Sequence, residues 1–168
     1  MLVDSYRFLP KSFIPLYENP ARIEGEDQPI LTPFAPRLAD ATIGLLSSAG
    51  LSLSSEQAPF DLDGERANPM WGDPGYRVLP HELAGRPLTM SHLHVNPADI
   101  IADHNVALPT DRLDELVAAG RVGRAAPHHT SVMGYQEAGL AAWRNETAPA
   151  IVELLRSEGV DGVVLAPV

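Results

Sequence analysis

The chain is organised around Leu88-Thr-Met-Ser-His-Leu-His-Val-Asn-Pro-Ala-Asp-Ile-Ile-Ala-Asp-His-Asn105. Apolar and polar residues alternate from Leu88 to Val95, which predicts a β-strand with His92 and His94 on one face. The Asn96-Pro97 pair ends this strand and predicts a short helical turn after it. A strand end that meets a turn rich in polar side chains indicates a candidate site.

The helical turn adds carboxylates and a third imidazole to this stretch. Asp99 and Asp103 are separated by one helical turn in sequence, so they share a face of a helix. Together with His92, His94 and His104 they form a set of side chains that could hold a metal ion. The structural alternative is that the two strand histidines hydrogen-bond to Asp99 and Asp103 without any metal.

Composition limits the possible functions. The 168 residues suit a single domain, and a net charge of −10 without a basic block argues against nucleic-acid and anionic membrane partners. No run approaches the roughly 20 apolar residues of a membrane span, and the first residues lack a signal-peptide core. We therefore expect a cytoplasmic protein. The absence of cysteine excludes disulfides, thiolate metal sites and a cysteine nucleophile within this chain.

The first part of the chain is rich in proline. Prolines recur from Pro10 to Pro36 at intervals too short for a useful helix. Residues 1–37 are therefore predicted to form an extended arm with aromatic anchors that packs against another subunit. Residues 38–168 are predicted to hold the sheet and helices of a single α/β domain.

The clearest buried strand lies within Ala41–Gly50. Its apolar run is followed by the small residues Ser47, Ser48, Ala49 and Gly50, at the carboxyl end where open α/β sheets bind ligands. Ser48 and Gly50 are therefore candidate substrate-binding residues. The alternative is that small residues are needed there for close packing of the backbone.

Strand and helix patterns alternate along the rest of the chain. This order predicts an α/β fold with a parallel-type sheet flanked by helices. Thr110 is the expected N-cap of one helix, and Gly120 its C-terminal stop. The last element is predicted to be a buried, central-type parallel strand. The predicted elements are a surface loop over Leu51–Gly75, strands at Tyr76–Leu79, Arg121–Ala126 and Val160–Val168, and helices at Pro109–Ala119, Gly139–Trp143 and Asn145–Ser157.

The final strand ends the sequence where an α/β protein normally places its chemistry. We therefore expect the chain to be the N-terminal part of a larger protein, or one chain of a two-chain unit. A downstream segment or a partner chain would then complete the site.

Several motifs in the same order resemble one known family. The chain resembles the substrate-binding component B of the glycine, sarcosine and betaine reductases, also called selenoprotein B, over almost its whole length. The motifs that carry the resemblance are Val3-Asp-Ser-Tyr-Arg-Phe-Leu-Pro10, Gly72-Asp-Pro-Gly-Tyr-Arg77, Ser91-His-Leu-His94, Leu108-Pro-Thr-Asp-Arg-Leu113, Ala126-Pro-His-His-Thr-Ser-Val-Met-Gly134 and Gly159-Val-Asp-Gly-Val-Val-Leu-Ala-Pro-Val168.

The resemblance implies an oxidoreductase subunit that cleaves a C–N or other C–heteroatom bond of a small molecule. In that family a cysteine or selenocysteine motif follows the final strand, and its thiol or selenol displaces the amine from the substrate carbon. This implies a hetero-oligomer in which a second chain or a downstream part supplies the Cys/Sec centre. His92, His94 and His129 would act as catalytic residues, and Asn105 and Arg77 would bind substrate.

Two histidines depart from the family pattern. His104 and His128 replace residues of other types, and the additional imidazoles favour metal binding. His92, His94, Asp103 and His104 would then hold a divalent ion such as zinc or iron. Besides the reductase-like subunit, two functions therefore stay open. One is a metal-dependent lyase or hydrolase, and the other is a non-catalytic assembly subunit.

Overall fold

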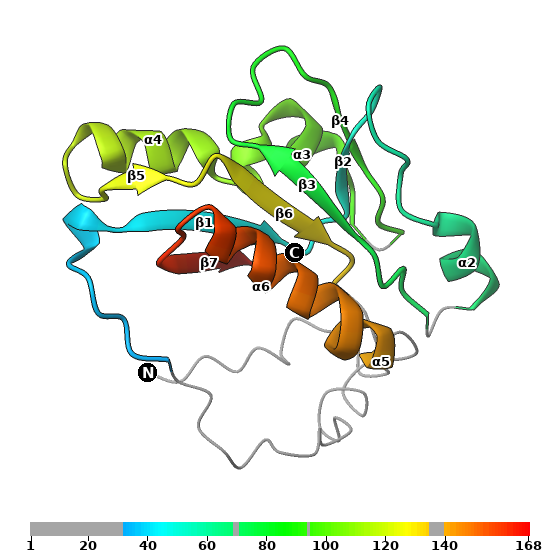
Figure 1. Ribbon diagram of the computed structural model, residues 1–168. Helices are drawn as coiled ribbons and strands as arrows, with labels where there is room; N and C mark the ends of the chain where they lie inside the picture. Colours follow the sequence, from blue (N-terminus) through cyan, green and yellow to red (C-terminus); the bar gives the residue numbers. More distant parts are fainter. Residues whose placement is uncertain (1–31, 69–70, 94, 135–139) are drawn as a thin grey trace, which may run out of the picture. The chain divides into compact units, whose positions relative to one another are not determined.

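The central strand of the sheet is β1 (Thr42–Ser47), which is buried along nearly its whole length. The computed structural model describes residues 32–68, 71–93, 95–134 and 140–168, and Phe34–Val168 form one compact unit. The strand predicted within Ala41–Gly50 is confirmed (Figure 1). Most of the predicted arm, with its aromatic anchors, lies outside the described residues.

Parallel pairing on both sides of β1 builds the core of the sheet. β5 (Arg124–Ala125) and β6 (His128–Val132) pair with one edge of β1, and β7 (Gly162–Ala166) pairs with the other. The predicted α/β fold with a parallel-type sheet flanked by helices is confirmed. β3 (Tyr76–Pro80) joins the far side of β6 in the antiparallel direction. Whether a strand is parallel or antiparallel depends on its partner strand, which the local pattern of residues does not reveal.

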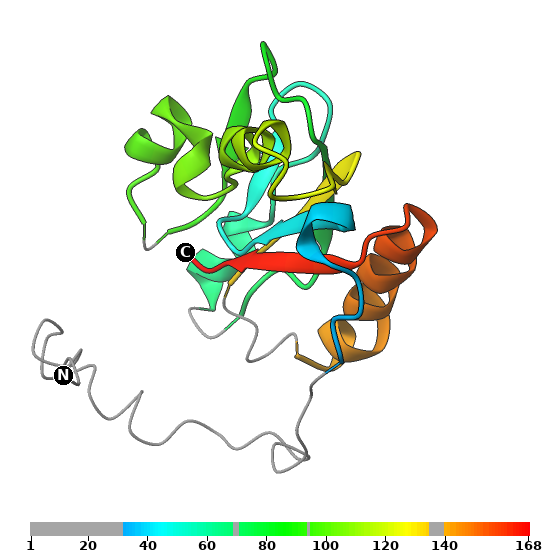
Figure 2. The same ribbon diagram turned by 90° about the vertical axis from the view of Figure 1, so that its left-hand side faces the viewer.

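The final strand lies at the edge of the sheet, with β1 as its only partner strand among the described residues. Its parallel direction is as predicted, but the predicted burial is wrong. Val163, Val164 and Leu165 are 39, 49 and 66 % exposed. Apolar runs occur both in central strands and in edge strands that another element covers. The apolar composition of β7 therefore did not determine where it lies in the sheet. Figures 1 and 2 show β7 in red outside β1.

One continuous helical segment covers one face of the sheet. α5 (Leu140–Ala142) continues through the π-helical η5 (Trp143–Thr147) into α6 (Ala148–Ser157). The two helices predicted in this region are therefore joined. Ile151 and Leu155 of α6 are buried in a cluster with Val132 of β6. α6 ends at Ser157, as predicted, and Gly159 just after it has a φ of 69°.

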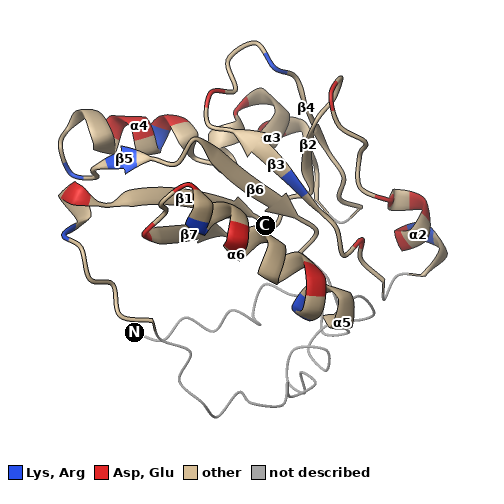
Figure 3. Ribbon diagram, viewed as in Figure 1, with Lys and Arg blue, Asp and Glu red and all other residues tan. Residues whose placement is uncertain are grey.

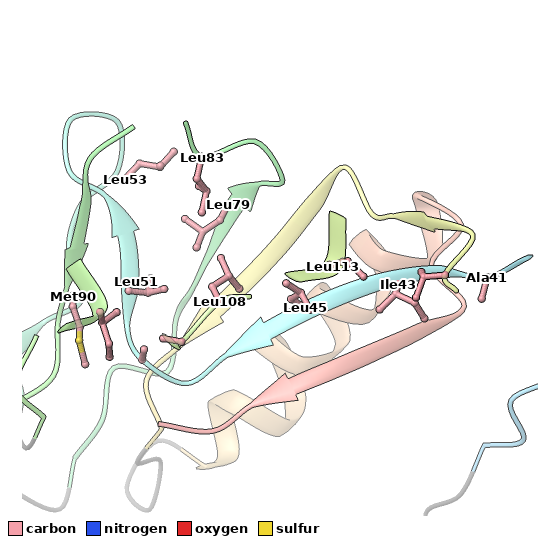
Figure 4. Close-up of a cluster of buried hydrophobic side chains, with 14 residues drawn as sticks. Ala41, Ile43, Leu45, Leu51, Leu53, Leu79, Leu83, Met90, Leu108 and Leu113 are labelled. Carbon is pink, nitrogen blue, oxygen red and sulfur yellow. The ribbon is translucent and has the colours of Figure 1, made fainter. Parts of the chain in front are cut away.

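The opposite face of the sheet carries the larger core cluster. α3 (Ala98–Ala102), the 3₁₀ turn η4 (His104–Val106) and α4 (Thr110–Ala118) lie on this side. Leu45 of β1 and Leu113 of α4 belong to this buried cluster, which Figure 4 shows. Gly120, with a φ of 65°, follows α4 as the predicted stop.

A small second sheet pairs β2 (Leu51–Leu53) with β4 (Leu88–Met90) in the antiparallel direction. The strand predicted over Leu88–Val95 is therefore too long. It ends at Met90 because Met90 pairs with Leu51, the first residue of the short partner strand. The surface loop predicted over Leu51–Gly75 is also wrong in part, since it begins with the buried β2 and contains α2 (Leu62–Ala67).

The remaining short elements lie outside the two sheets. The Asp61 side chain caps α2 by accepting a hydrogen bond of 2.9 Å from the Gly64 backbone N–H. The 3₁₀ turn η3 (Leu38–Asp40) precedes β1. Within the described ranges, no helix is long and apolar enough to cross a membrane.

Candidate functional site

A cavity of about 580 Å³ opens at the carboxyl ends of β1, β6 and β7. Its size lies within the range of small-molecule sites. The position is the one predicted for ligand binding from the small residues that follow β1. We call it the carboxyl-end cavity. Its lining is mostly apolar and comprises Leu46, Ser48, Val132, Met133, Gly134, Leu140, Trp143, Leu165, Ala166 and Pro167.

Ser48 lies at the point where β1 and β7 leave the sheet. Its backbone N–H donates to the Ala166 carbonyl at 3.2 Å. Its hydroxyl oxygen accepts a hydrogen bond of 2.8 Å from the Val168 N–H, and its distance to the Val168 carbonyl oxygen is 3.4 Å. Ser48 therefore holds the end of β7 against the cavity and contributes a hydroxyl to its lining.

Gly50 does not line the carboxyl-end cavity, and its conformation explains why glycine is present. Its φ is 63°, and a Cβ atom there would lie 2.3 Å from the Ser91 carbonyl oxygen and 2.8 Å from the Met133 sulfur. Its own carbonyl accepts a hydrogen bond of 2.9 Å from the Ser91 N–H. These contacts support the alternative of close packing for Gly50.

Trp143 is an aromatic residue of the cavity lining that the sequence did not mark. It begins the π-helical segment η5, and such segments are frequent at functional sites. Its indole nitrogen is buried and has no hydrogen-bond partner among the described residues. The Trp143 ring therefore contributes aromatic surface to the lining, while its nitrogen is buried.

The other polar cluster is a line of hydrogen bonds on the opposite face of the same strands. The Leu45 backbone N–H donates to Nδ1 of His129 at 3.1 Å. Nε2 of His129 lies 2.8 Å from Nδ1 of His81, and Nε2 of His81 lies 2.8 Å from Oδ1 of Asp114. We call these four groups the histidine network. It joins β1, β6, the end of β3 and α4.

The donor at Leu45 fixes the tautomers of both rings. Nδ1 of His129 must accept, so its proton lies on Nε2 and is donated to His81. His81 then carries its own proton on Nε2 and donates it to Asp114. Both rings are neutral in this arrangement, and every ring nitrogen has a partner.

The surroundings of His129 favour the neutral form. Its side chain is fully buried. Burial, followed by the charges of His81 and His128, lowers the pKa of His129 from 6.5 to about 4, against the opposing effect of Asp114. The structure places this predicted catalytic residue across the sheet from the carboxyl-end cavity, within the histidine network.

His128 points to the other side of the sheet from His129, as expected for neighbouring residues of a strand. Its Nδ1 lies 2.5 Å from Oε1 of Glu158, just after α6. Only His129 of this pair joins the histidine network.

The described polar residues of the stretch from Leu88 to Asn105 do not line the cavity. His92 is half-buried just after β4, and His94 lies outside the described residues. Within the described ranges, no group of three or more His, Asp or Glu side chains could hold a metal ion. Because the predicted set of His92, His94, Asp103 and His104 includes a residue that is not described, metal binding stays a prediction.

The polar residues after α3 organise the start of α4. The Asp103 carboxylate accepts hydrogen bonds from the Asn105 side chain and backbone, which lower the pKa of Asp103. The Asn105 amide oxygen accepts from the Asp111 N–H at 3.0 Å, and its nitrogen donates to the Asp111 carboxylate at 2.8 Å. Thr110 is not the N-cap but the first residue of α4, and its hydroxyl lies 2.8 Å from Nε2 of His104. Asn105 therefore caps α4.

Arg77, which was predicted to bind substrate, contacts neighbouring segments of this chain. Its guanidinium donates to the carbonyls of Ala58 and Pro59 at 2.8 and 3.0 Å and lies 4.1 Å above the Phe60 ring. It also lies 3.9 Å from Asp73. These contacts fix the loop before α2.

Sequence reasoning did not select Trp143, His81 or Asp114. His81 and His129 are 48 positions apart, and His81 and Asp114 are 33 apart, so no local spacing connects them. Trp143 follows a weak helical pattern and gives no sign of facing a cavity.

Fold and site together define an α/β protein with a mostly apolar cavity at the carboxyl ends of its parallel strands. No protein-family model and no solved structure matches the chain. It is similar to the D-proline reductase subunit gamma of Acetoanaerobium sticklandii, with 29% identity over 137 residues. The match covers 82% of this chain and 52% of that protein. The chain thus spans about half the length of a relative that is itself a reductase subunit.

Proposed function

We propose that this chain is a subunit, or the first part, of a reductase that cleaves a C–N or other C–heteroatom bond of a small molecule. The similarity to a D-proline reductase subunit supports the reaction class. The observation that carries the proposal is the carboxyl-end cavity, whose lining includes Ser48 and the end of β7. The finer assignment, to the component B type of glycine, sarcosine and betaine reductases, rests on the motifs quoted above.

The thiol or selenol nucleophile would come from outside this sequence, because the sequence has no cysteine. A thiol or selenol would displace the leaving group from the substrate carbon. The hydrogen bond between Ser48 and Val168 places the end of β7 beside the cavity. A Cys/Sec segment that continues from β7, or that docks beside it from a second chain, would therefore reach a bound substrate.

This chain would bind and orient the substrate. The cavity encloses the apolar part of the molecule, and the groups that follow β4 provide candidates for protonating the leaving group. Ser91 bonds to Gly50 beside the small-residue loop, and His92 follows Ser91 directly. His92 does not line the described part of the cavity, so the proposed role of proton donor for His92 and His94 rests on the family resemblance alone. His129 is not used, since both of its ring nitrogens are engaged in the histidine network.

The test begins with the native protein. Intact mass spectrometry of the purified native complex should show a cysteine- or selenocysteine-containing polypeptide bound to, or continuous with, this sequence. The complex should then consume a dithiol only when a substrate is present, with release of the leaving group. Alkylation of the thiol or selenol should abolish turnover. An 18.1 kDa chain that purifies alone and shows no thiol-dependent turnover would contradict the proposal.

A further inference from the structure

Among the described residues, the lining of the carboxyl-end cavity contains no charged side chain. Its strand residues, such as Leu46, Val132 and Leu165, are aliphatic, and Ser48 contributes the one hydroxyl of this described lining. Figure 3 shows β1, β6 and β7 without Lys, Arg, Asp or Glu at their carboxyl ends. The described site therefore offers no positive group to a carboxylate.

The polar groups of the lining are neutral. The indole N–H of Trp143 is buried without a partner among the described residues. The Ser48 hydroxyl can donate its proton to the Val168 carbonyl oxygen, at the long distance of 3.4 Å. The Ser48 hydroxyl can donate to a ligand, and neither group can neutralise a charge. A carboxylate moved from water into such a site loses hydration without gaining an ion pair.

We propose that the carboxyl-end cavity takes an uncharged, mainly apolar small molecule with a hydrogen-bond acceptor, and not a free amino acid. The acceptor bonds to the Ser48 hydroxyl, and the apolar body contacts the aliphatic lining and the Trp143 ring. This inference names the substrate class of the same site and so rests on the proposed function. It separates this chain from its relative, because D-proline is a zwitterion near neutral pH.

The test compares benzamide with benzoate, which have nearly the same size and differ in charge, and adds D-proline. The chain has two tryptophans, so Trp71→Phe leaves Trp143 as the only indole reporter. We expect benzamide to change the Trp143 fluorescence saturably and to bind at least ten times more tightly than benzoate or D-proline. Trp143→Phe with Trp71 retained should remove the signal.

A charge introduced into the lining should reverse the preference. Leu165 is 66 % exposed and lines the cavity, so Leu165→Arg places a cation there without burying it. We expect this variant to bind benzoate more tightly than benzamide. Val164→Arg is the matched control, because Val164 is 49 % exposed on the opposite face of the same strand. It should keep the preference for benzamide.

The outcomes separate this inference from the proposed function. Binding of benzoate or D-proline as tight as that of benzamide, or no binding of benzamide, overturns the inference even if thiol-dependent turnover is found. Benzamide binding with the expected effects of both arginine variants supports the inference. It does so even if the native complex shows no thiol-dependent turnover, which would contradict only the proposed function.

Discussion

The histidine network and the carboxyl-end cavity lie on opposite faces of β1 and β6. They differ in whether their buried polar groups have hydrogen-bond partners. In the network every ring nitrogen of His81 and His129 has a partner. At the cavity the Trp143 indole nitrogen has none among the described residues. Partnered buried groups stabilise a fold, whereas a buried donor without a partner lowers its stability. His129, which the sequence predicts to be catalytic, has partners for both of its ring nitrogens in this network.

The largest expected effect comes from removing the network. His129→Ala leaves a void in a fully buried position and deprives the Leu45 N–H and His81 of their partners. We expect a loss of about 3–5 kcal/mol in the free energy of unfolding, measured by urea denaturation. His128→Ala is the control, because its side chain is 44% exposed, and about 1 kcal/mol is expected. Equal losses would contradict a special role for the network.

The second effect is a dependence of stability on pH. The folded state keeps His129 neutral down to a pKa of about 4, whereas the unfolded chain takes up the proton below about 6.5. Stability from this group is therefore full above pH 6.5 and is lost as the pH falls toward 4, by about 3 kcal/mol. Urea denaturation between pH 4 and 7 measures the loss. His129→Gln cannot be protonated, so its profile should lack this part, and identical profiles would refute the assignment.

The third effect concerns Gly50, in the small-residue loop that follows β1. Gly50→Ala forces a Cβ atom onto the Ser91 carbonyl and the Met133 side chain at a φ of 63°. We expect a loss of about 2–3 kcal/mol in thermal or urea unfolding. Gly85→Ala is the matched control, since Gly85 has a φ of 73° but no atom within 4 Å of the added Cβ. It should lose about 1 kcal/mol. A reversed order would mean that close packing does not explain Gly50.

The smallest effect separates capping from substrate binding. Asn105→Ala removes the cap of α4 and should lower the free energy of unfolding by about 1 kcal/mol. Because Asn105 does not line the carboxyl-end cavity, the affinity for benzamide should stay unchanged. Asn105→Asp, which keeps an acceptor for the Asp111 N–H but adds a charge beside Asp103 and Asp111, should lose part of the same stability. A weakened benzamide affinity would return Asn105 to the substrate site.

Much of the fold followed from local patterns in the sequence. The apolar run after Ala41 predicted the central strand, and Gly120 predicted the end of the helix before it. These features depend on backbone conformation and side-chain period within a few residues, which the sequence contains. The small residues after this strand mark its carboxyl end, where the cavity lies, while ligand binding there stays a prediction.

What the tertiary structure decided are the relations between distant segments. The apolar residues of β7 indicated burial, but its place at the edge of the sheet leaves Leu165 exposed and beside the cavity. His129 could have faced a substrate or a partner side chain, and its burial beside His81, 48 positions away, favours its neutral form. Composition and spacing fix the chemistry that a side chain can perform, while its neighbours in space decide whether that chemistry is free to act.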